Sequence, residues 1–256
     1  MLSPEQVAAF FEVGFAVQPH VFTPDEIGEM RAAFERLEHA AYRLKSTQMH
    51  RGSQFVLSSV PDGSGPPHVR IDRIVWCGAA EPVLSALGQD PRLLAMASQL
   101  LGSREMNHLI NQAHFKLPGD GVDFPWHQDS THRRYGGEEW QDLNGRGSFV
   151  QTVTAIDDVT TANGPLQVIP GSCKLGHVDP PEGGVGWLPT DRLDPRTAVS
   201  VTMTAGSVLL FGPYTFHRSR PNSSPRPRRV FINGFAYPGA NSRIYPGAGA
   251  GRLVTS

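Results

Sequence analysis

Apolar and polar positions near the N-terminus follow the spacing of a short helix and then a strand. Ser3 and Pro4 form a helix start, and Gln6 completes a capping box in which side chains satisfy free backbone N–H groups. Gly14 suits a left-handed helix end. The pattern therefore predicts a helix that ends at Gly14, followed by a short strand at 15–17.

A second, longer helix is predicted from Thr23 to about Leu44. Thr23 and Glu26 repeat the capping signature. Apolar side chains then recur three or four positions apart, which is the period of one helix face, at Ile27, Met30, Phe34, Leu37 and Ala41. Residues 46–68 are rich in Ser, Gly and Pro and are interpreted as a loop, and 68–76 as a strand.

A third helix is predicted between Asp90 and Gly102, after which the pattern changes to short apolar runs separated by Gly, Pro and Asn. These runs predict strands at about 108–117, 124–129, 148–156, 165–169, 199–203, 206–211, 214–218 and 229–237. Eight short strands after a helical lead-in are typical of a mainly β fold, a double-sheet jelly roll with flanking helices. We expect one domain over 1–256, with the lead-in to about 105, the core over about 106–238 and a Gly-rich tail at 239–256, mobile or folded over a site.

Composition excludes several function classes. The 256 residues are 39% hydrophobic and carry a formal net charge of -1, so no overall basic field attracts nucleic acid. Two cysteines make no disulfide framework, the N-terminus is unlike a signal peptide, and no apolar run reaches the length of a membrane span. We therefore expect a cytoplasmic protein without a membrane or nucleic-acid partner. Its oligomeric state is not readable from the sequence.

The segment PWHQD, at 125–129, holds the first candidate for chemistry. Side chains two apart on a strand share a face, so His127 and Asp129 are expected to project together. An imidazole and a carboxylate can chelate a divalent metal, but they need a third ligand. A histidine and an aspartate at this spacing are common by chance, so the pair alone is weak evidence.

The C-terminal half supplies the missing groups. His217 lies near the end of a strand, Ser219 follows on the same face, and Arg228 starts the next apolar strand. In an antiparallel hairpin this offset would return the arginine beside the serine. Two histidines and one carboxylate form the facial triad that suits non-haem Fe(II), and an arginine with a hydroxyl suits one carboxylate of a diacid.

Four segments together resemble the phytanoyl-CoA dioxygenase family of Fe(II)/2-oxoglutarate oxygenases. They are LSPEQVAAFFEVGFAV, HFKLPGDGVDFPWHQD, NGPLQVIPGSCKLGH and HRSRPNSSPRPRRVFINGF, spread from about residue 3 to 238. The resemblance implies a double-stranded β-helix, a cupin-like jelly roll, that binds Fe(II) and consumes 2-oxoglutarate and O2. It also implies hydroxylation of an unactivated C–H bond with release of succinate and CO2.

The resemblance implies roles for individual residues. His127, Asp129 and His217 would bind iron, and Arg228 with Ser219 would hold the C5 carboxylate of 2-oxoglutarate. His114 would contact the C1 end of the cosubstrate, and Gln112 on the same strand face could share that task. Phe124 resembles an aromatic residue that lines the cosubstrate pocket.

Candidate substrate contacts lie next to these residues. Arg133 and Arg134 follow the HxD segment and are either a solvated turn or a site for an anionic group, a role that Arg73 could share. His132 is either a loop residue touching substrate or the third ligand of a zinc site.

Three readings of the function follow. The first is a hydroxylase of a small polar or anionic metabolite or natural-product intermediate, with an acyl-CoA hydroxylase as its variant. The second is a zinc-type metallohydrolase that uses His127, Asp129 and His132. The third is a non-catalytic binding protein, which is disfavoured because no triad residue is missing.

Overall fold

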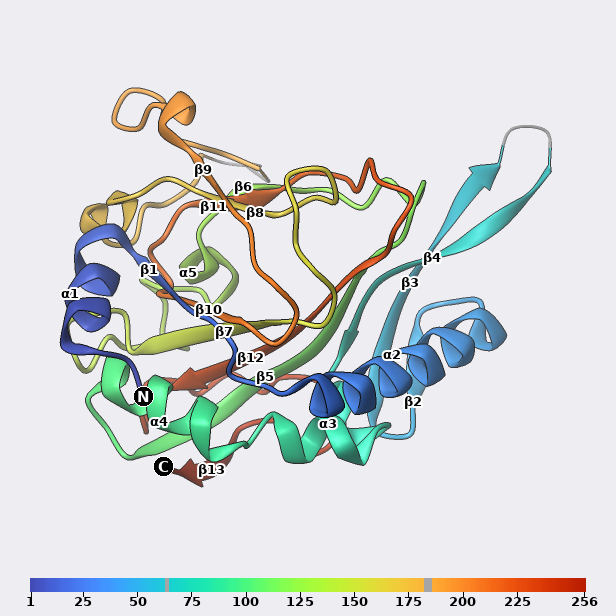
Figure 1. Cartoon of the computed structure of the whole chain (residues 1–256). Coiled ribbons are helices and arrows are strands. Elements are labelled where there is room, and N and C mark those ends of the chain that lie inside the picture. Colours follow the sequence, from blue (N-terminus) through green and yellow to red (C-terminus); the bar gives the residue numbers. More distant parts are fainter. Residues whose placement is uncertain (63–64, 182–185) are drawn as a thin grey trace.

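The computed structural model describes residues 1–62, 65–181 and 186–256. Two antiparallel β-sheets face each other, and most helices lie on the outer side of the larger sheet (Figure 1). This arrangement confirms the predicted mainly β jelly roll with flanking helices.

The N-terminal elements follow the sequence prediction closely. Helix α1 (Pro4–Val13) and helix α2 (Pro24–Leu44) flank strand β1 (Phe15–Gln18). Both helices begin with a capping box, at Ser3 and at Thr23, and α1 ends at Gly14 in the left-handed conformation. The five predicted apolar positions of α2 are all buried. Local capping chemistry therefore determines these boundaries.

The prediction of a loop at 46–68 is wrong. This segment contains β2 (Gln48–His50), β3 (Ser53–Asp62) and the start of β4 (Gly65–Val75), paired as an antiparallel meander. The alternating burial of Phe55 and Leu57 is the strand signal that the Ser, Gly and Pro content obscured.

Short helices connect this meander to the central strands. The 3-10 turn η1 (Cys77–Ala79) and helix α3 (Pro82–Leu87) were not predicted, because both are too short to show a helical period. Helix α4 (Pro91–Leu101) is confirmed, with Asp90 as its N-cap and Gly102 as its left-handed end. It leads into β5 (Glu105–Lys116).

All eight strands predicted after residue 107 exist within a few residues of their expected bounds. The remaining elements are β6 (Phe124–His127), α5 (Asp129–His132), β7 (Phe149–Ala155), β8 (Leu166–Val168), η2 (Ser172–Leu175), η3 (Pro195–Thr197), β9 (Val199–Val201), β10 (Val208–Phe211), β11 (His217–Ser219), β12 (Arg228–Ala236) and β13 (Arg252–Thr255). The larger sheet has the order β1-β10-β7-β12-β5-β4-β3-β2, with β13 paired to β5. The smaller sheet has the order β6-β11-β8-β9.

Strand β12 shows how the larger sheet separates two cores. Phe231 and Phe235 pack with the helices on the outer side, whereas Val230 and Ile232 face the space between the sheets. The strand is buried along its whole length, as expected for a strand covered on both faces. The space between the sheets is where a site can form.

A bulge in β4 changes which side chains enter that space. Arg73 is opposite Val56 and Ile71 is opposite Leu57, so Asp72 is an extra residue in the strand. Ile71 packs in the outer core, and without the bulge Arg73 would point the same way. The bulge turns Arg73 into the space between the sheets, where it lines a cavity.

The C-terminal tail is folded rather than a loose end. Strand β13 pairs with β5, and Ala248 donates its backbone N–H to the Gly52 carbonyl, 2.8 Å away. Tail residues Arg243, Tyr245 and Pro246 line the same cavity as Arg73. The tail therefore forms part of a wall over the interior.

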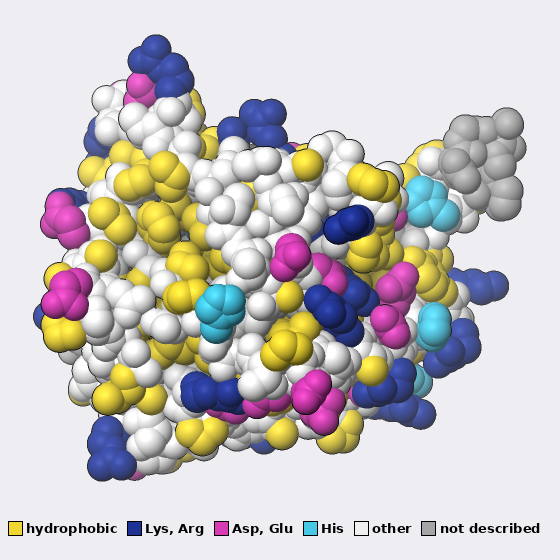
Figure 2. Space-filling model, in the orientation of Figure 1, with side chains coloured by type: hydrophobic (Ala, Val, Ile, Leu, Met, Phe, Trp, Pro, Cys, Tyr) yellow, Lys and Arg dark blue, Asp and Glu magenta, His cyan; other side chains and the backbone are white. Residues whose placement is uncertain are grey.

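The surface is charged without a single dominant sign on the face shown in Figure 2. Basic and acidic side chains intermingle there over the region of α2. Within the described residues, no helix has both the length and the apolar character that crossing a membrane requires.

Candidate metal centre and cavity

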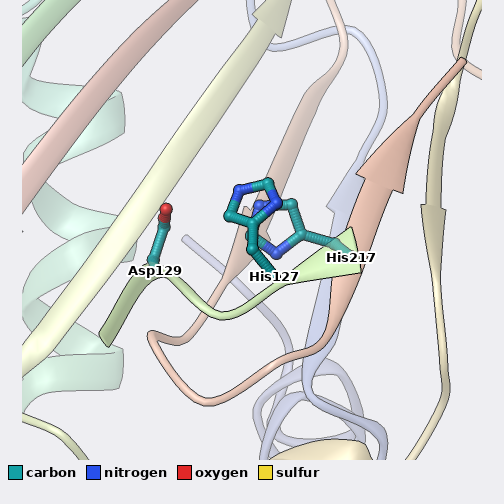
Figure 3. A group of neighbouring side chains, drawn as sticks. All are labelled: His127, Asp129 and His217. Carbon is teal, nitrogen blue, oxygen red and sulfur yellow. The ribbon is translucent and has the colours of Figure 1, made fainter. Parts of the chain in front are cut away.

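Two histidines meet across the smaller sheet. His127 ends β6 and His217 begins β11, and the antiparallel register places them directly opposite each other. Their ring centroids are 4.2 Å apart (Figure 3). Segments ninety residues apart in the chain are thus joined by strand pairing.

Each imidazole is held so that one nitrogen stays available. Nδ1 of His127 lies 2.7 Å from the Pro125 carbonyl, and Nδ1 of His217 lies 2.9 Å from the Thr215 carbonyl. A carbonyl only accepts, so Nδ1 carries the proton in both rings and Nε2 has a free lone pair. In typical metal-binding histidines, a hydrogen bond from the nitrogen that does not bind the metal fixes the orientation of the ring, and the Nδ1 contacts do so here.

Asp129 completes the group, although for a different reason than predicted. Strand β6 ends at His127, and Asp129 is the first residue of α5, so the strand-face argument does not apply. The turn nevertheless brings the carboxylate beside the two rings (Figure 3). One ligand atom from each of His127, Asp129 and His217 lies within 4.8 Å of the others. Asp129 Oδ2 is buried and has no hydrogen-bond partner among the residues that the structure describes.

The charge states of Asp129 and His217 suit a divalent cation. Burial tends to raise the pKa of Asp129, but the positive charge of Arg133 and the nearby histidines outweigh it, and the pKa lies well below its usual range. Burial, followed by His127, lowers the pKa of His217 to about 3. At neutral pH the site thus offers a carboxylate and neutral imidazole, the donor set of a facial triad. The residues fit an Fe(II) ion.

A cavity of about 690 Å³ opens from this group into the space between the sheets. Its walls are largely apolar and include Val153, Leu209, Phe211, Phe216, Val230 and Ile232. Among the described lining residues, five are arginines (Arg73, Arg133, Arg218, Arg228 and Arg243) and one, Asp129, is acidic. The interior therefore favours anionic ligands.

Arg228 and Ser219 both line the cavity, but they are not hairpin partners as predicted. Ser219 belongs to β11 in the smaller sheet and Arg228 to β12 in the larger sheet, so they line the cavity from opposite sheets. Arg228 is 5% exposed and donates from Nη2 to the Gly164 carbonyl at 2.7 Å, and its Nε has no partner in the described part of the chain. A buried guanidinium with a free donor is suited to a carboxylate.

The other predicted cosubstrate residues lie nearby. His114 and Gln112 share the inner face of β5, with His114 Nε2 2.9 Å from Gln112 Oε1. Phe124 lies opposite Ser219 in the strand register, and its ring centroid is 5.5 Å from that of His114. Burial, followed by the charge of Arg73, lowers the pKa of His114 to about 3, so this ring is neutral at neutral pH.

The predicted substrate contacts separate into three groups. Arg133 is 4% exposed and faces Asp129, with Nη1 3.5 Å from Oδ1, so its charge is already engaged. Arg134 is exposed, pairs with Glu139 at 3.1 Å, and lies outside the cavity lining, as expected for the solvated-turn alternative. Arg73 and His132 do line the cavity. The His132 ring centroid is 5.1 Å from that of His127, yet the ligand cluster contains His217 instead.

Three residues of the site were missed in the sequence. Lys116 is buried beside Arg228, and a lysine within an apolar strand was the available signal. Arg243 and Tyr245 of the tail line the cavity, and the buried Tyr245 hydroxyl has no hydrogen-bond partner within 1–62, 65–181 and 186–256. The Gly-rich tail gave no pattern that would have placed them.

Comparison with known proteins agrees with this geometry. The family model described as Phytanoyl-CoA dioxygenase (PhyH) matches residues 10–230. An ectoine dioxygenase of Bordetella parapertussis is 29% identical over 252 residues, covering 90% of this chain and 74% of that protein.

Solved structures show the same fold. EvdO2 from Micromonospora carbonacea var. aurantiaca, complexed with 2-oxoglutarate, has a TM-score of 0.69 at 22% identity and 96% coverage of both chains. EctD from S. alaskensis with bound Fe has a TM-score of 0.68 at 26% identity, covering 96% of this chain and 80% of that one. The chain therefore belongs to the phytanoyl-CoA dioxygenase family of Fe(II)- and 2-oxoglutarate-dependent dioxygenases.

Proposed function

We propose that this protein hydroxylates an unactivated C–H bond of a small polar or anionic metabolite or natural-product intermediate. Bound iron and 2-oxoglutarate supply the oxidation, in which O2 gives one oxygen atom to the substrate and one to succinate, with loss of CO2. The observation that carries the proposal is the cluster of His127, Asp129 and His217 at a cavity that also contains buried Arg228.

His127, Asp129 and His217 would hold the iron through two Nε2 atoms and a carboxylate oxygen. The carbonyls of Pro125 and Thr215 fix the two rings, so the ligands need little rearrangement on binding. Three protein ligands leave coordination positions open for cosubstrate and O2. Retention of the carboxylate argues for hydroxylation, desaturation or ring formation, and hydroxylation is the outcome proposed here.

Arg228 and Ser219 would bind the C5 carboxylate of 2-oxoglutarate. The support is the free Nε of Arg228 and the position of both side chains on the cavity wall. His114 and Gln112 would orient the C1 end, and Phe124 would exclude water from the same pocket. These roles place the two ends of the cosubstrate between β5, β11 and β12.

A compact anionic substrate suits the remaining space. Arg133 is engaged by Asp129 and Arg228 is assigned to the cosubstrate, whereas Arg73 has no ion-pair partner among the described residues. We assign Arg73 to an anionic group of the substrate, and His132 to its polar contacts near the mouth. A cavity of about 690 Å³ favours a compact substrate over a whole CoA ester.

We also propose that residues 1–256 act as one catalytic domain in the cytoplasm. The helical lead-in packs on the larger sheet and the tail lines the cavity, so each segment contributes to one unit. Cys77 and Cys173 are both free thiols, as expected in a reducing compartment.

Anaerobic visible absorption with Fe(II) and 2-oxoglutarate tests the assignment. Chelation of iron by the keto acid should give a charge-transfer band, and Arg228→Met should raise the dissociation constant at least about tenfold through loss of a charged hydrogen-bonded contact. The control is Arg226→Met, because Arg226 is exposed two residues away. Folded, metal-loaded protein without a band would refute the proposal.

The zinc-hydrolase alternative requires a different set of metal ligands. It needs His132 as a metal ligand and has no use for His217, whereas the structure groups His217 with His127 and Asp129. Iron binding that survives His132→Gln but not His217→Gln supports the oxygenase. The reverse result would support the hydrolase.

A further inference from the structure

Lys116 is a buried cation without a carboxylate partner. It ends β5, is 1% exposed, and lies opposite Arg228 in the antiparallel register of β5 and β12. Within 1–62, 65–181 and 186–256, no acidic side chain forms an ion pair with it. Buried lysines are rare unless their charge is compensated, so this position needs an explanation.

Three backbone carbonyls accept hydrogen bonds from the Lys116 ammonium group. Its Nζ lies 2.8 Å from the Val122 carbonyl, 2.8 Å from the Ser219 carbonyl and 2.6 Å from the Arg220 carbonyl. Carbonyls accept only, and three N–H donors exist only in the ammonium form. Only the charged form can donate to all three carbonyls, and its donors are then all occupied, so Lys116 does not itself touch a ligand.

These contacts connect three parts of the candidate site. Val122 lies in the segment that enters β6, which carries His127, while Ser219 and Arg220 follow His217 in and beyond β11. Nζ also lies 5.3 Å from the ring centroid of Phe124, which lines the cavity. Lys116 thereby fixes the backbone at Ser219, whose side chain belongs to the proposed cosubstrate pocket.

Arg228 adds a second buried positive charge beside Lys116. Burial and then the charge of Arg228 lower the pKa of Lys116 to about 6, so a nearby anion is needed for the ammonium form to predominate at neutral pH, and burial lowers the pKa of Arg228 to about 10. Two adjacent buried cations repel each other unless an anion joins them. The far carboxylate of a dicarboxylate cosubstrate would supply that anion.

We propose that Lys116 is a positioning residue for the cosubstrate, and that its ammonium strengthens binding of the C5 carboxylate without contacting it. It acts by fixing the Ser219 backbone and by adding positive potential next to Arg228. The inference rests on the proposed function, in which Arg228 and Ser219 hold that carboxylate.

The test compares two keto acids on Lys116→Met. The probes are 2-oxoglutarate and 2-oxopentanoate, which keeps the chelating keto acid but lacks the C5 carboxylate. Dissociation constants come from anaerobic absorption titrations with Fe(II), and thermal unfolding with each probe gives a second readout. Affinity for 2-oxoglutarate should fall about tenfold or more, whereas affinity for 2-oxopentanoate should change less than about twofold.

Lys174→Met is the matched control, because it removes the same charge from an exposed lysine that pairs with Glu12. It should leave both constants unchanged. Lys116→Arg keeps the charge and should retain most of the preference for 2-oxoglutarate. If Lys116→Met does not fold, Lys116→Gln takes its place, since it keeps two N–H donors and loses the charge.

The outcomes separate this inference from the function on which it rests. Equal losses for both keto acids, or no loss for either, would overturn the role of Lys116 while the wild-type band still supports the oxygenase. Absence of the band in both wild type and Lys174→Met would instead overturn the proposed function.

Discussion

Arg133 contacts both the carboxylate and the backbone carbonyl of Asp129, a residue of the candidate metal centre. Its Nη1 lies 3.5 Å from Asp129 Oδ1 and 2.9 Å from the Asp129 carbonyl, while Nη2 bonds Gln151 at 3.1 Å. The guanidinium carbon stacks 3.6 Å from the Phe149 ring centroid. These contacts hold both terminal nitrogens of Arg133, so the arginine positions the carboxylate, and only its Nε has no partner among the described residues.

Replacing Arg133 should therefore weaken metal binding. In Arg133→Leu, burial would no longer be opposed by the arginine charge, so the pKa of Asp129 should rise and protons should compete with metal. Loss of such an outer partner typically costs about tenfold to 100-fold in metal affinity. Anaerobic Fe(II) titrations at several pH values should show this loss growing as the pH falls.

Arg134→Leu is the neighbouring control, because Arg134 is exposed and pairs with Glu139. It should bind Fe(II) like the wild type. If Arg133→Leu kept normal metal affinity and only raised the KM of a substrate, the positioning role of Arg133 would be wrong.

Displacing the tail should open the cavity without destroying the metal centre. Gly247 has φ +111°, and a Cβ there would lie 2.1 Å from Trp76 Cβ, so Gly247→Ala cannot keep the present path. Hydrogen exchange at the Ala248 amide should become about tenfold faster as local opening becomes easier. Wasteful 2-oxoglutarate turnover without substrate should increase, because the wall formed by Tyr245 moves away.

Gly251→Ala separates steric clash from backbone strain. Gly251 also has positive φ, at +85°, but a Cβ there meets no atom within 4 Å. Both substitutions carry a similar strain of about 1 kcal/mol, so only the clash distinguishes them. Matching exchange rates in the two variants would mean that contact with Trp76 does not hold the tail.

The sequence predicted those parts of the fold that depend on local chemistry. Caps at Ser3, Thr23 and Asp90 and the short apolar runs of the jelly roll gave boundaries within a few residues. The family resemblance identified His127 and His217 in advance, and the structure brings them together; their role in binding iron stays a prediction.

What the sequence missed depends on the register between strands. The bulge at Asp72 turns Arg73 into the cavity, and a bulge is defined only by the partner strand. Likewise, Ser219 and Arg228 line the cavity from two different sheets, and their spacing along the chain cannot distinguish this arrangement from a hairpin. The position of the C-terminal tail along the cavity depends on the pairing of β13 with β5, a strand that lies more than a hundred residues earlier in the chain.

Buried neutral histidines should make the metal-free protein sensitive to mild acid. Burial lowers the pKa of His108 to about 4, and its Nε2 lies 3.0 Å from Asn233 Oδ1. Between pH 6.5 and 4 the unfolded chain binds a proton that the folded His108 does not, so folding free energy is lost as the pH falls. Each such histidine contributes up to about 1.4 kcal/mol per pH unit. Urea unfolding of metal-free His108→Gln across this range should show a shallower pH dependence by about that amount, and a slope equal to that of the wild type would show that His108 does not cause the acid sensitivity.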